Sequence, residues 1–355
     1  MSLASFKRDT GQFRCSISIM STTLSHTKIK DEIFLAVALV GLGMTIGSLL
    51  TRYKAKYKVP KVWKESQGKS AFSSTNRPTA GATFTKPLPR GKHALQLYSL
   101  GTPNGVKVTT LLEELILIYG PAVEYDAFLI NIYQGDQFSS GFVKANPNSK
   151  IPVLVHYENG FEPPKITRVF ETSAIMLYLC EKFDTKHVFL PAVGDPLRAE
   201  CLSWLMFTHG SAPYLGGGFG HFFSYAEEKI PYAINRYSME TKRQLDVLDK
   251  HLSPSGAGAP YLCGAKLTIA DFACWAWYGS LVLGRLYTGS DQFLQVKDYL
   301  HVLLWAKRLD ARKGVRRGRK VNRSWGESHM KLLERHSVSD LEALEKQEES
   351  LTKPE

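Results

Sequence analysis

The sequence predicts an α/β domain at residues 93–190, followed by an all-helical domain at residues 196–336. Three observations support this fold class. From Ala94 onwards, short runs rich in β-branched and aromatic residues alternate with amphipathic helical runs. From Pro196 to about residue 323, aromatic and aliphatic residues recur at helical spacing almost throughout. The chain has 355 residues, of which 44% are hydrophobic, and this is enough for two domains with extensions.

The first domain is predicted to run β-α-β-α-β-β-α, the order of a thioredoxin-like domain with helices on a four-stranded sheet. Its strands are expected at residues 94–100, 123–130, 151–157 and 165–171. Its helices are expected at residues 105–118, near 136–143 and at 172–183. The apolar residues of the first helix share one face, so Glu113 and Glu114 are expected on the solvated side.

Three places in this domain stand out. The corner between the first strand and the first helix, "YSLGTPNGVKV", contains no cysteine, although a thiol-handling domain often carries one there. Pro152 opens the third strand, where proline can hold a cis bond and leave the backbone of Ile151 free to pair with a ligand. Glu171 and Thr172 begin the last helix, where backbone N–H groups and a hydroxyl can hold a carboxylate.

In the helical domain, Thr268 and Asp271 have the spacing of a capping box and predict a helix start. The five cysteines show no C-x-x-C spacing, which indicates neither a disulfide framework nor a zinc site and favours a reducing compartment. Cys180 and Cys274 lie in apolar helical patterns, where buried and inert thiols are expected. His209 and His221 have no further ligand cluster around them, so no metal is expected.

The N-terminal part of the chain has a different character. Residues 33–50, "IFLAVALVGLGMTIGSLL", carry no charge and predict a transmembrane helix, with a buried core helix as the alternative. Basic residues follow this segment, which favours a membrane anchor with the C-terminal side in the cytosol. Residues 1–32 then form an N-terminal extension, residues 51–92 a basic linker and arm, and residues 337–355 an acidic tail.

The formal net charge of +12 makes nucleic acid or an anionic membrane face candidate partners. The basic run "ARKGVRRGRKVNR" at residues 311–323 holds seven basic residues but no interleaved aromatic residues. We interpret this run as a solvated structural face and expect no nucleic-acid binding.

Several long segments carry a resemblance to a known family. "LQLYSLGTPNGVKV", "GDQFSSGFVKANPNSKIP", "LGGGFGHF", "YAINRYSMETKRQLDVLDK" and "VRRGRKVNR" resemble the Nu-class glutathione transferases of bacteria and fungi, and specifically the YghU-type disulfide-bond oxidoreductases. The resemblance runs from about Val59 to His336 and leaves residues 1–58 without a counterpart. It implies a glutathione transferase fold, a homodimer, and one or two glutathiones bound in each subunit.

The resemblance also explains the missing cysteine, because in this family the reactive sulfur belongs to glutathione. It implies that Thr102 and Asn104 are catalytic, since their hydroxyl and amide can donate hydrogen bonds that stabilise a thiolate more than a thiol. A helix N-terminus lowers the thiol pKa further. Without the resemblance, Thr102 could simply cap the helix and Asn104 could simply form the turn. The glutathione-binding residues that it implies are Asn76, Thr102, Pro103, Asn104, Gln137, Lys150, Ile151, Glu171, Thr172, His209 and Arg236.

Two of these positions depart from the family pattern. Thr172 replaces the usual Ser and keeps the hydroxyl. His209 replaces Gln at a position that serves the second glutathione, which changes the pH dependence expected there.

Arg236, in the helical domain, resembles an arginine that binds a carboxylate of the ligand. The run "LGGGFGH" at residues 215–221 lacks phosphate-loop spacing and is expected to line the mouth of the site.

Three functions remain open on the sequence. The first is the glutathione-dependent reduction of small disulfides with no protein cysteine in the cycle. The second is conjugation or peroxide reduction, for which the same bound thiolate would serve. The third is a non-catalytic, membrane-anchored scaffold or sensor, against which the retention of the whole residue set argues.

Overall fold

The computed structural model describes residues 58–65, 75, 77–158 and 165–352. The predicted extension (residues 1–32), the predicted membrane-spanning segment (residues 33–50) and Asn76 lie outside these ranges. Within them, no helix combines the length and apolar character needed to cross a bilayer. The chain divides into two compact units, Met1–Ser66 and Gln67–Glu355. Residues 58–65 of the first unit contain no helix or strand, and the second unit holds all elements described below.

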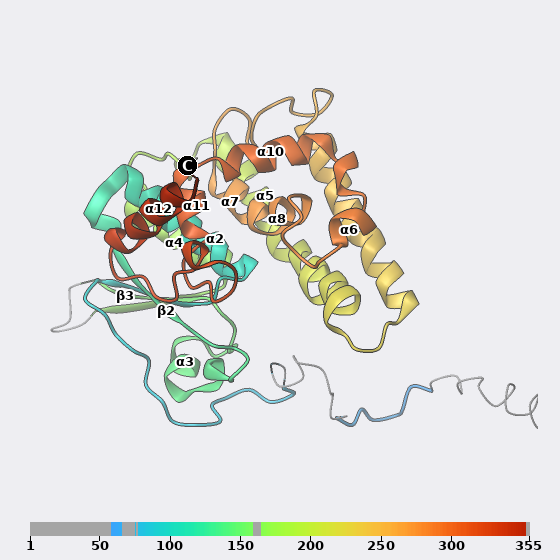
Figure 1. The fold of residues 1–355 in the computed structure, drawn as a ribbon, viewed down its shortest axis with the longest axis horizontal. Coiled ribbons are helices and arrows are strands. Elements are labelled where there is room, and N and C mark those ends of the chain that lie inside the picture. Colours follow the sequence, from blue (N-terminus) through green and yellow to red (C-terminus); the bar gives the residue numbers. More distant parts are fainter. Residues whose placement is uncertain (1–57, 66–74, 76, 159–164, 353–355) are drawn as a thin grey trace, which may run out of the picture. The chain divides into compact units, whose positions relative to one another are not determined.

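A four-stranded mixed sheet forms the centre of the first domain (Figure 1). Its strands are β1 (Leu95–Ser99), β2 (Tyr125–Leu129), β3 (Val153–Tyr157) and β4 (Ile166–Phe170), and their order in the sheet is β2-β1-β3-β4. β1 pairs in parallel with β2 and antiparallel with β3, and β3 pairs antiparallel with β4. All four strands lie within their predicted ranges, because their apolar runs and turn boundaries are local signals.

Helices cover both faces of the sheet. α2 (Pro103–Tyr119) and α4 (Thr172–Phe183) pack on one face, where their apolar residues meet Leu95, Leu97 and Leu154. α3 (Ser140–Ala145) covers the other face and packs with Tyr98 and Val153. Successive residues of a strand point to opposite faces, which is why Leu97 and Tyr98 belong to different layers. Short 3-10 segments, η2 (Gly120–Val123) and η3 (Asp136–Phe138), connect these elements.

The second domain is helical, as predicted (Figure 1). The capping box of Thr268 and Asp271 is formed at the start of α7, and the main hydrophobic core continues without a break from α2 and α4 into this domain. Its elements are α5 (Pro196–Pro213), η4 (a π-helix, Tyr214–Tyr225), α6 (Pro231–Leu252), α7 (Ile269–Cys274), η5 (a π-helix, Trp275–Gly279), α8 (Ser280–Val282), α9 (Ser290–Phe293), η6 (Val296–Asp298), α10 (Leu300–Asp310), α11 (Lys313–Gly318), η7 (Ser328–Met330) and α12 (Val338–Thr352).

The prediction that Glu113 and Glu114 face solvent is wrong. Both are buried in α2, with side-chain exposures of 0% and 2%. Glu113 accepts from the Nε of Arg335 at 2.8 Å and from the hydroxyl of Tyr125 at 2.8 Å. Glu114 forms a bidentate pair with Arg312 at 2.9 and 2.6 Å. Buried carboxylates need such partners, and the two arginines lie 222 and 198 residues further along the chain.

The interpretation of residues 311–323 as a solvated face is also wrong for much of the run. The side chains of Arg317 and Lys320 are 4% and 6% exposed and pair with Glu345 and Glu348 of α12, each at 2.7 Å. The predicted acidic tail therefore forms a helix whose carboxylates neutralise α11 and the residues that follow it.

Candidate functional site

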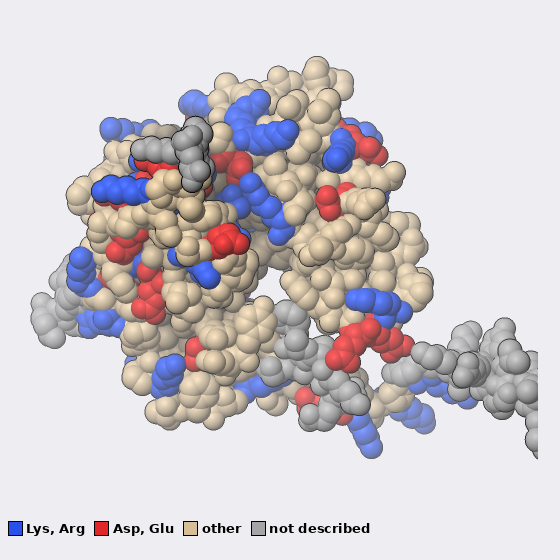
Figure 2. Space-filling model, in the orientation of Figure 1, with Lys and Arg blue, Asp and Glu red and all other residues tan. Residues whose placement is uncertain are grey.

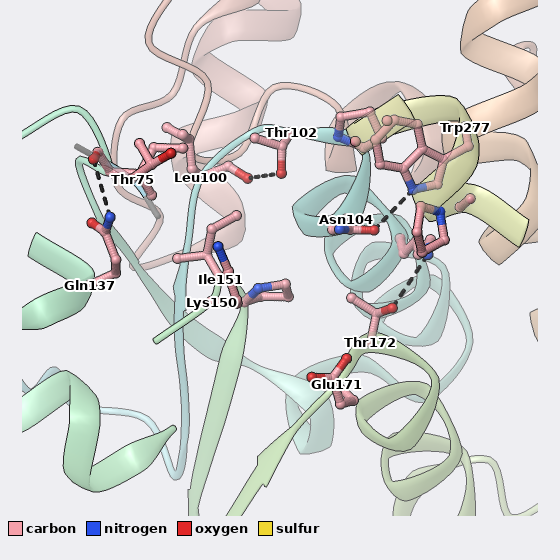
Figure 3. Close-up of a pocket in the computed structure, with 18 of the residues that line it drawn as sticks. Thr75, Leu100, Thr102, Asn104, Gln137, Lys150, Ile151, Glu171, Thr172 and Trp277 are labelled. Carbon is pink, nitrogen blue, oxygen red and sulfur yellow. Dashed lines mark hydrogen bonds between the residues drawn. The ribbon is translucent and has the colours of Figure 1, made fainter. Parts of the chain in front are cut away.

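One large cavity, of about 750 Å³, lies between the first domain and the helical domain. The β1–α2 corner, the segment before β3 and the start of α4 contribute to its walls (Figure 3). Residues of α5 and η4 line it as well. Arg236 is exposed on α6 and does not line the cavity, and Asn76 lies outside the described residues. The predicted residues that the fold brings together here are Thr102, Pro103, Asn104, Gln137, Lys150, Ile151, Glu171, Thr172 and His209.

The corner at the start of α2 supplies two hydrogen-bonding groups. Thr102 is the N-cap residue, and its hydroxyl oxygen accepts from the backbone N–H of Gly105 at 3.4 Å. The hydroxyl proton of Thr102 points at the carbonyl of Leu100 across 3.5 Å, which is long for an O–H donor. Thr102 therefore caps the helix, and its proton can still turn towards a ligand.

Asn104 is oriented by a residue that the sequence did not indicate. The indole N–H of Trp277 in η5 donates to the side-chain oxygen of Asn104 at 2.9 Å. Because an indole nitrogen can only donate, the amide oxygen must face Trp277. The amide N–H groups are then directed away from Trp277 into the cavity (Figure 3).

The glycine run of η4 allows this arrangement. A Cβ atom on Gly216 would lie 2.5 Å from the ring of Trp277, so only glycine leaves room for the indole. Gly216 and Gly217 both line the cavity, which confirms that this run lies at the site. Two further glycines accommodate rings in the same way, Gly218 against Tyr237 and Gly220 against Tyr287.

At the start of α4, Glu171 is the N-cap residue with a φ of 69°, and Asn148 donates to its carboxylate at 3.3 Å. Thr172 follows, and its hydroxyl oxygen accepts from Lys107 at 3.4 Å. The N-terminus of α4 and these side chains form a polar end of the cavity that suits a ligand with both an amine and a carboxylate.

Lys107 is a second functional candidate that the sequence did not indicate. It is 3% exposed, lines the cavity, and forms no ion pair with a carboxylate among the described residues. Burial lowers the pKa of Lys107 to about 8, with Cys274 and Glu171 acting in the opposite direction. In the sequence, the only sign of this role is a lysine among the apolar residues of the helix that starts at "TPNGVKV".

The opposite wall offers groups for an extended ligand. The Ile151–Pro152 bond is cis, as the sequence suggested, and Asn146 donates to the carbonyl of Lys150 at 2.7 Å. Gln137 donates to the carbonyl of Ile132 at 3.3 Å, and its amide oxygen is buried without a hydrogen-bond partner among the described residues. That oxygen can accept from a ligand N–H group.

The cysteines lie elsewhere. Cys180, Cys201, Cys263 and Cys274 are all buried, and no cysteine among the described residues lines the cavity. Burial raises the pKa of Cys274 to about 12 and that of Cys180 well above its ordinary value. These thiols are therefore poor nucleophiles, as expected for Cys180 and Cys274. The described part of the chain also contains no cluster of three or more His, Cys, Asp or Glu side chains able to hold a metal ion.

Residues 231–308 match the family model described as glutathione S-transferase, C-terminal domain. The disulfide-bond oxidoreductase YghU of Escherichia coli is 52% identical over 287 residues, which cover 81% of this chain and 95% of that protein.

Two solved structures are similar as well. The glutathione transferase YghU from Streptococcus pneumoniae, complexed with glutathione, is 51% identical with a TM-score of 0.69, over 75% of this chain and 97% of that one. A glutathione transferase family member from Pseudomonas fluorescens, with two glutathione bound, is 31% identical with a TM-score of 0.56, over 65% of this chain and 94% of that one.

Proposed function

The chain belongs to the glutathione transferase family, among its YghU-type disulfide-bond oxidoreductases, and from this premise we propose that it reduces small disulfides with bound glutathione and no protein cysteine. The observation that carries the proposal is the corner at Thr102 and Asn104. It presents hydrogen-bond donors to the cavity, while the four described cysteines are buried away from it.

The reaction needs two glutathiones and no other reductant. The thiolate of the first glutathione attacks one sulfur of the substrate R–S–S–R, forms a mixed disulfide and expels one R–S⁻. The thiolate of the second attacks the glutathione sulfur of the mixed disulfide, expels the second R–S⁻ and forms oxidised glutathione. The two protons lost by glutathione end on the two R–SH products. The relative from Pseudomonas fluorescens, which holds two glutathione, supports room for both.

Thr102 and Asn104 act on the sulfur of the first glutathione. A free thiol has a pKa of about 8.5 and is mostly protonated at neutral pH. Hydrogen bonds from the Thr102 hydroxyl and the Asn104 amide, together with the N-terminus of α2, stabilise the thiolate and lower this pKa. The proton leaves before the attack, so the reactive form is already present when the disulfide arrives.

The remaining residues hold the tripeptide. Glu171 and Thr172 take the γ-glutamyl end, with the carboxylate of Glu171 accepting from the amine and the start of α4 binding the carboxylate. The buried amide oxygen of Gln137 and the backbone of Ile151 pair with the peptide groups. His209, at the edge of the cavity, serves the second glutathione. Arg236 stays a prediction, because it is exposed outside the cavity in this chain.

A variant in which all five cysteines are replaced by alanine tests the proposal. We expect it to retain the rate of disulfide reduction of the wild-type protein, with folding checked by circular dichroism. The same assay should include an aryl halide and an organic peroxide, and we expect the disulfide to give the highest kcat/KM. Loss of turnover in a folded cysteine-free protein would refute the proposal, as would a mixed disulfide trapped on the chain.

The placement of the enzyme in the cell is a separate proposal that rests on the sequence. We propose that residues 33–50 anchor the chain to a membrane with the catalytic domains in the cytosol, and that the domains form a homodimer. Membrane fractionation of the full chain and of a chain starting at Lys58 tests the anchor. The proposal predicts that only the full chain resists extraction with alkaline carbonate. Analytical ultracentrifugation of the shorter chain tests the dimer.

A further inference from the structure

A second pocket, of about 210 Å³, adjoins the cavity and contains three arginines. Arg285 follows α8, Arg319 follows α11, and Arg323 lies a few residues further along the chain. The two pockets share Pro103, Arg285, Leu286 and Trp325 in their walls. Lys and Arg side chains also gather where the first domain meets the helical domain on the face drawn in Figure 2.

The positive charge of this pocket is only partly neutralised. Asp310 accepts two hydrogen bonds from Arg285, each of 2.7 Å, and one from Arg319 at 3.1 Å. Arg323 donates to the carbonyl of Trp325 at 3.0 Å. Among the described residues, Asp310 is the one carboxylate that forms an ion pair with any of the three, so two positive charges remain in excess.

These guanidinium groups are also partly removed from water. The side chains of Arg285 and Arg319 are 30% and 17% exposed. Burial and the positive charges of Arg285 and Arg323 together lower the pKa of Arg319 to about 10, although Asp310 acts in the opposite direction. Burial and the charge of Arg285 likewise lower the pKa of Arg323. Positive charge held in this way is costly unless an anion binds beside it.

The pocket lies next to the place where the reactive sulfur is expected. Pro103, which lines both pockets, follows Thr102 in the chain. Gly101 donates to the carbonyl of Asn322 at 2.8 Å, and a Cβ atom on Gly101 would lie 3.0 Å from the Cα of Arg323. This close backbone contact holds Arg323 against the β1–α2 corner. A group attached a few bonds from a sulfur at Thr102 can therefore reach the arginines.

Building on the function proposed above, we propose that the pocket of Arg285, Arg319 and Arg323 binds an anionic group of the substrate, so that this enzyme prefers small disulfides that carry a carboxylate or phosphate near the sulfur. Guanidinium groups present planar pairs of N–H donors that match both anions. The low exposure of the pocket strengthens the attraction relative to that at an open surface. An anion-binding pocket would define the chemical class of the disulfide substrate, which the residues that hold glutathione do not specify.

Two disulfide substrates of equal length test whether the pocket recognises the charge of the substrate or its shape. Dithiodipropionate carries two carboxylates, and its diamide is neutral. We expect the wild-type protein to reduce the diacid with a kcat/KM about tenfold or more above that of the diamide, the ratio given by one charge-assisted hydrogen bond. Arg323→Gln should remove most of this ratio. Arg323→Lys should retain part of it, because it keeps the charge but loses the planar fork.

Arg316→Gln is the matched control. Arg316 is exposed on α11, lines neither pocket, and its loss changes the net charge by the same amount. The inference is overturned when Arg323→Gln and Arg316→Gln show the same ratio of diacid to diamide. It is also overturned when Arg323→Gln raises the KM for glutathione and leaves the ratio unchanged, because the anion would then be a carboxylate of glutathione.

A binding measurement separates this inference from the proposed function. Calorimetry with the thioether analogue of the diacid, which cannot be reduced, needs no turnover. Weaker binding to Arg323→Gln than to Arg316→Gln supports the pocket even when the protein reduces neither disulfide, in which case only the proposed function fails. Equal binding to the two variants overturns the inference.

Discussion

The hydrogen bond from Trp277 to Asn104 makes a sharp prediction about the bound thiol. We expect Trp277→Phe to raise the pKa of the thiol of bound glutathione. Phenylalanine keeps an aromatic ring beside Gly216 but has no N–H group, so the side-chain oxygen of Asn104 loses its donor. The amide can then rotate, and its own N–H groups no longer point steadily at the sulfur.

The size of the effect follows from the interaction that is lost. A hydrogen bond to a charged group contributes about 1.5–3 kcal/mol, and one pKa unit corresponds to about 1.4 kcal/mol. Losing the hydrogen bond from Asn104 to the thiolate should therefore raise the thiol pKa by about one to two units. At a pH below that pKa, each unit lowers the thiolate fraction about tenfold, and kcat/KM should fall in parallel.

The thiol pKa can be measured from the ultraviolet absorbance of the thiolate as the pH is varied, with glutathione saturating the site. Trp204→Phe is the control, because Trp204 donates its N–H to Glu200 at 2.7 Å and does not line the cavity. It should leave the thiol pKa unchanged. The reasoning is refuted when Asn104→Ala raises the thiol pKa but Trp277→Phe does not.

Three further predictions concern packing and charge. Gly216→Ala should displace Trp277 and raise the thiol pKa in the same assay, because the new Cβ would lie 2.5 Å from the ring. Arg335→Met should lower the free energy of unfolding by about 3–5 kcal/mol in urea titrations, since it leaves the buried carboxylate of Glu113 without its ion-pair partner. Lys107→Met should change how stability depends on pH. Burial lowers the pKa of Lys107 from 10.5 to about 8, so the unfolded wild-type chain binds the extra proton between these values. Stability of the wild type should then rise with pH across this window by up to about 3 kcal/mol relative to the variant.

Each of these has its own control or contrary result. Gly217→Ala is the match for Gly216→Ala, because nothing lies within 4 Å of a Cβ atom on Gly217, and an equal effect of the two would contradict the packing argument. For Arg335→Met, a loss of about 1 kcal/mol or less, as for an exposed ion pair, would show that the pair is not buried in solution. For Lys107→Met, the contrary result is a difference in stability from wild type that stays constant between pH 7.5 and 10.5.

The sequence predicted the strands and the helices of the first domain closely. β1 and β3 carry apolar runs bounded by turn residues, and α4 begins with Thr172 as expected. Such signals are local, so a single sequence contains them. The missing cysteine marks the corner at Thr102 and Asn104 as unusual, because it sits at a recognisable strand-to-helix junction, but the catalytic role of these two residues was implied only by the family resemblance.

What the sequence could not show depends on distant partners. In the sequence, Glu113 and Glu114 look like surface residues, because the apolar residues of the same helix recur at a spacing that puts them on a separate face. The arginines that form ion pairs with them lie 222 and 198 residues further along the chain. Trp277 is 173 residues from the Asn104 that it orients, and nothing in its own segment marks it. No local period encodes a contact of this kind.

The ion pairs that Glu113 and Glu114 form with Arg335 and Arg312 also bear on how the protein folds during its synthesis. During synthesis the first domain leaves the ribosome long before Arg312 and Arg335 do, and N-terminal domains usually fold as they emerge. Here Glu113 and Glu114 would have to be buried without counterions, so completing the core of the emerging domain is costly. The missing positive charges are supplied only after Arg312 and Arg335 have been synthesised. A premature stop codon shortly before Arg335 should therefore damage the first domain, although it removes nothing from that domain's own sequence.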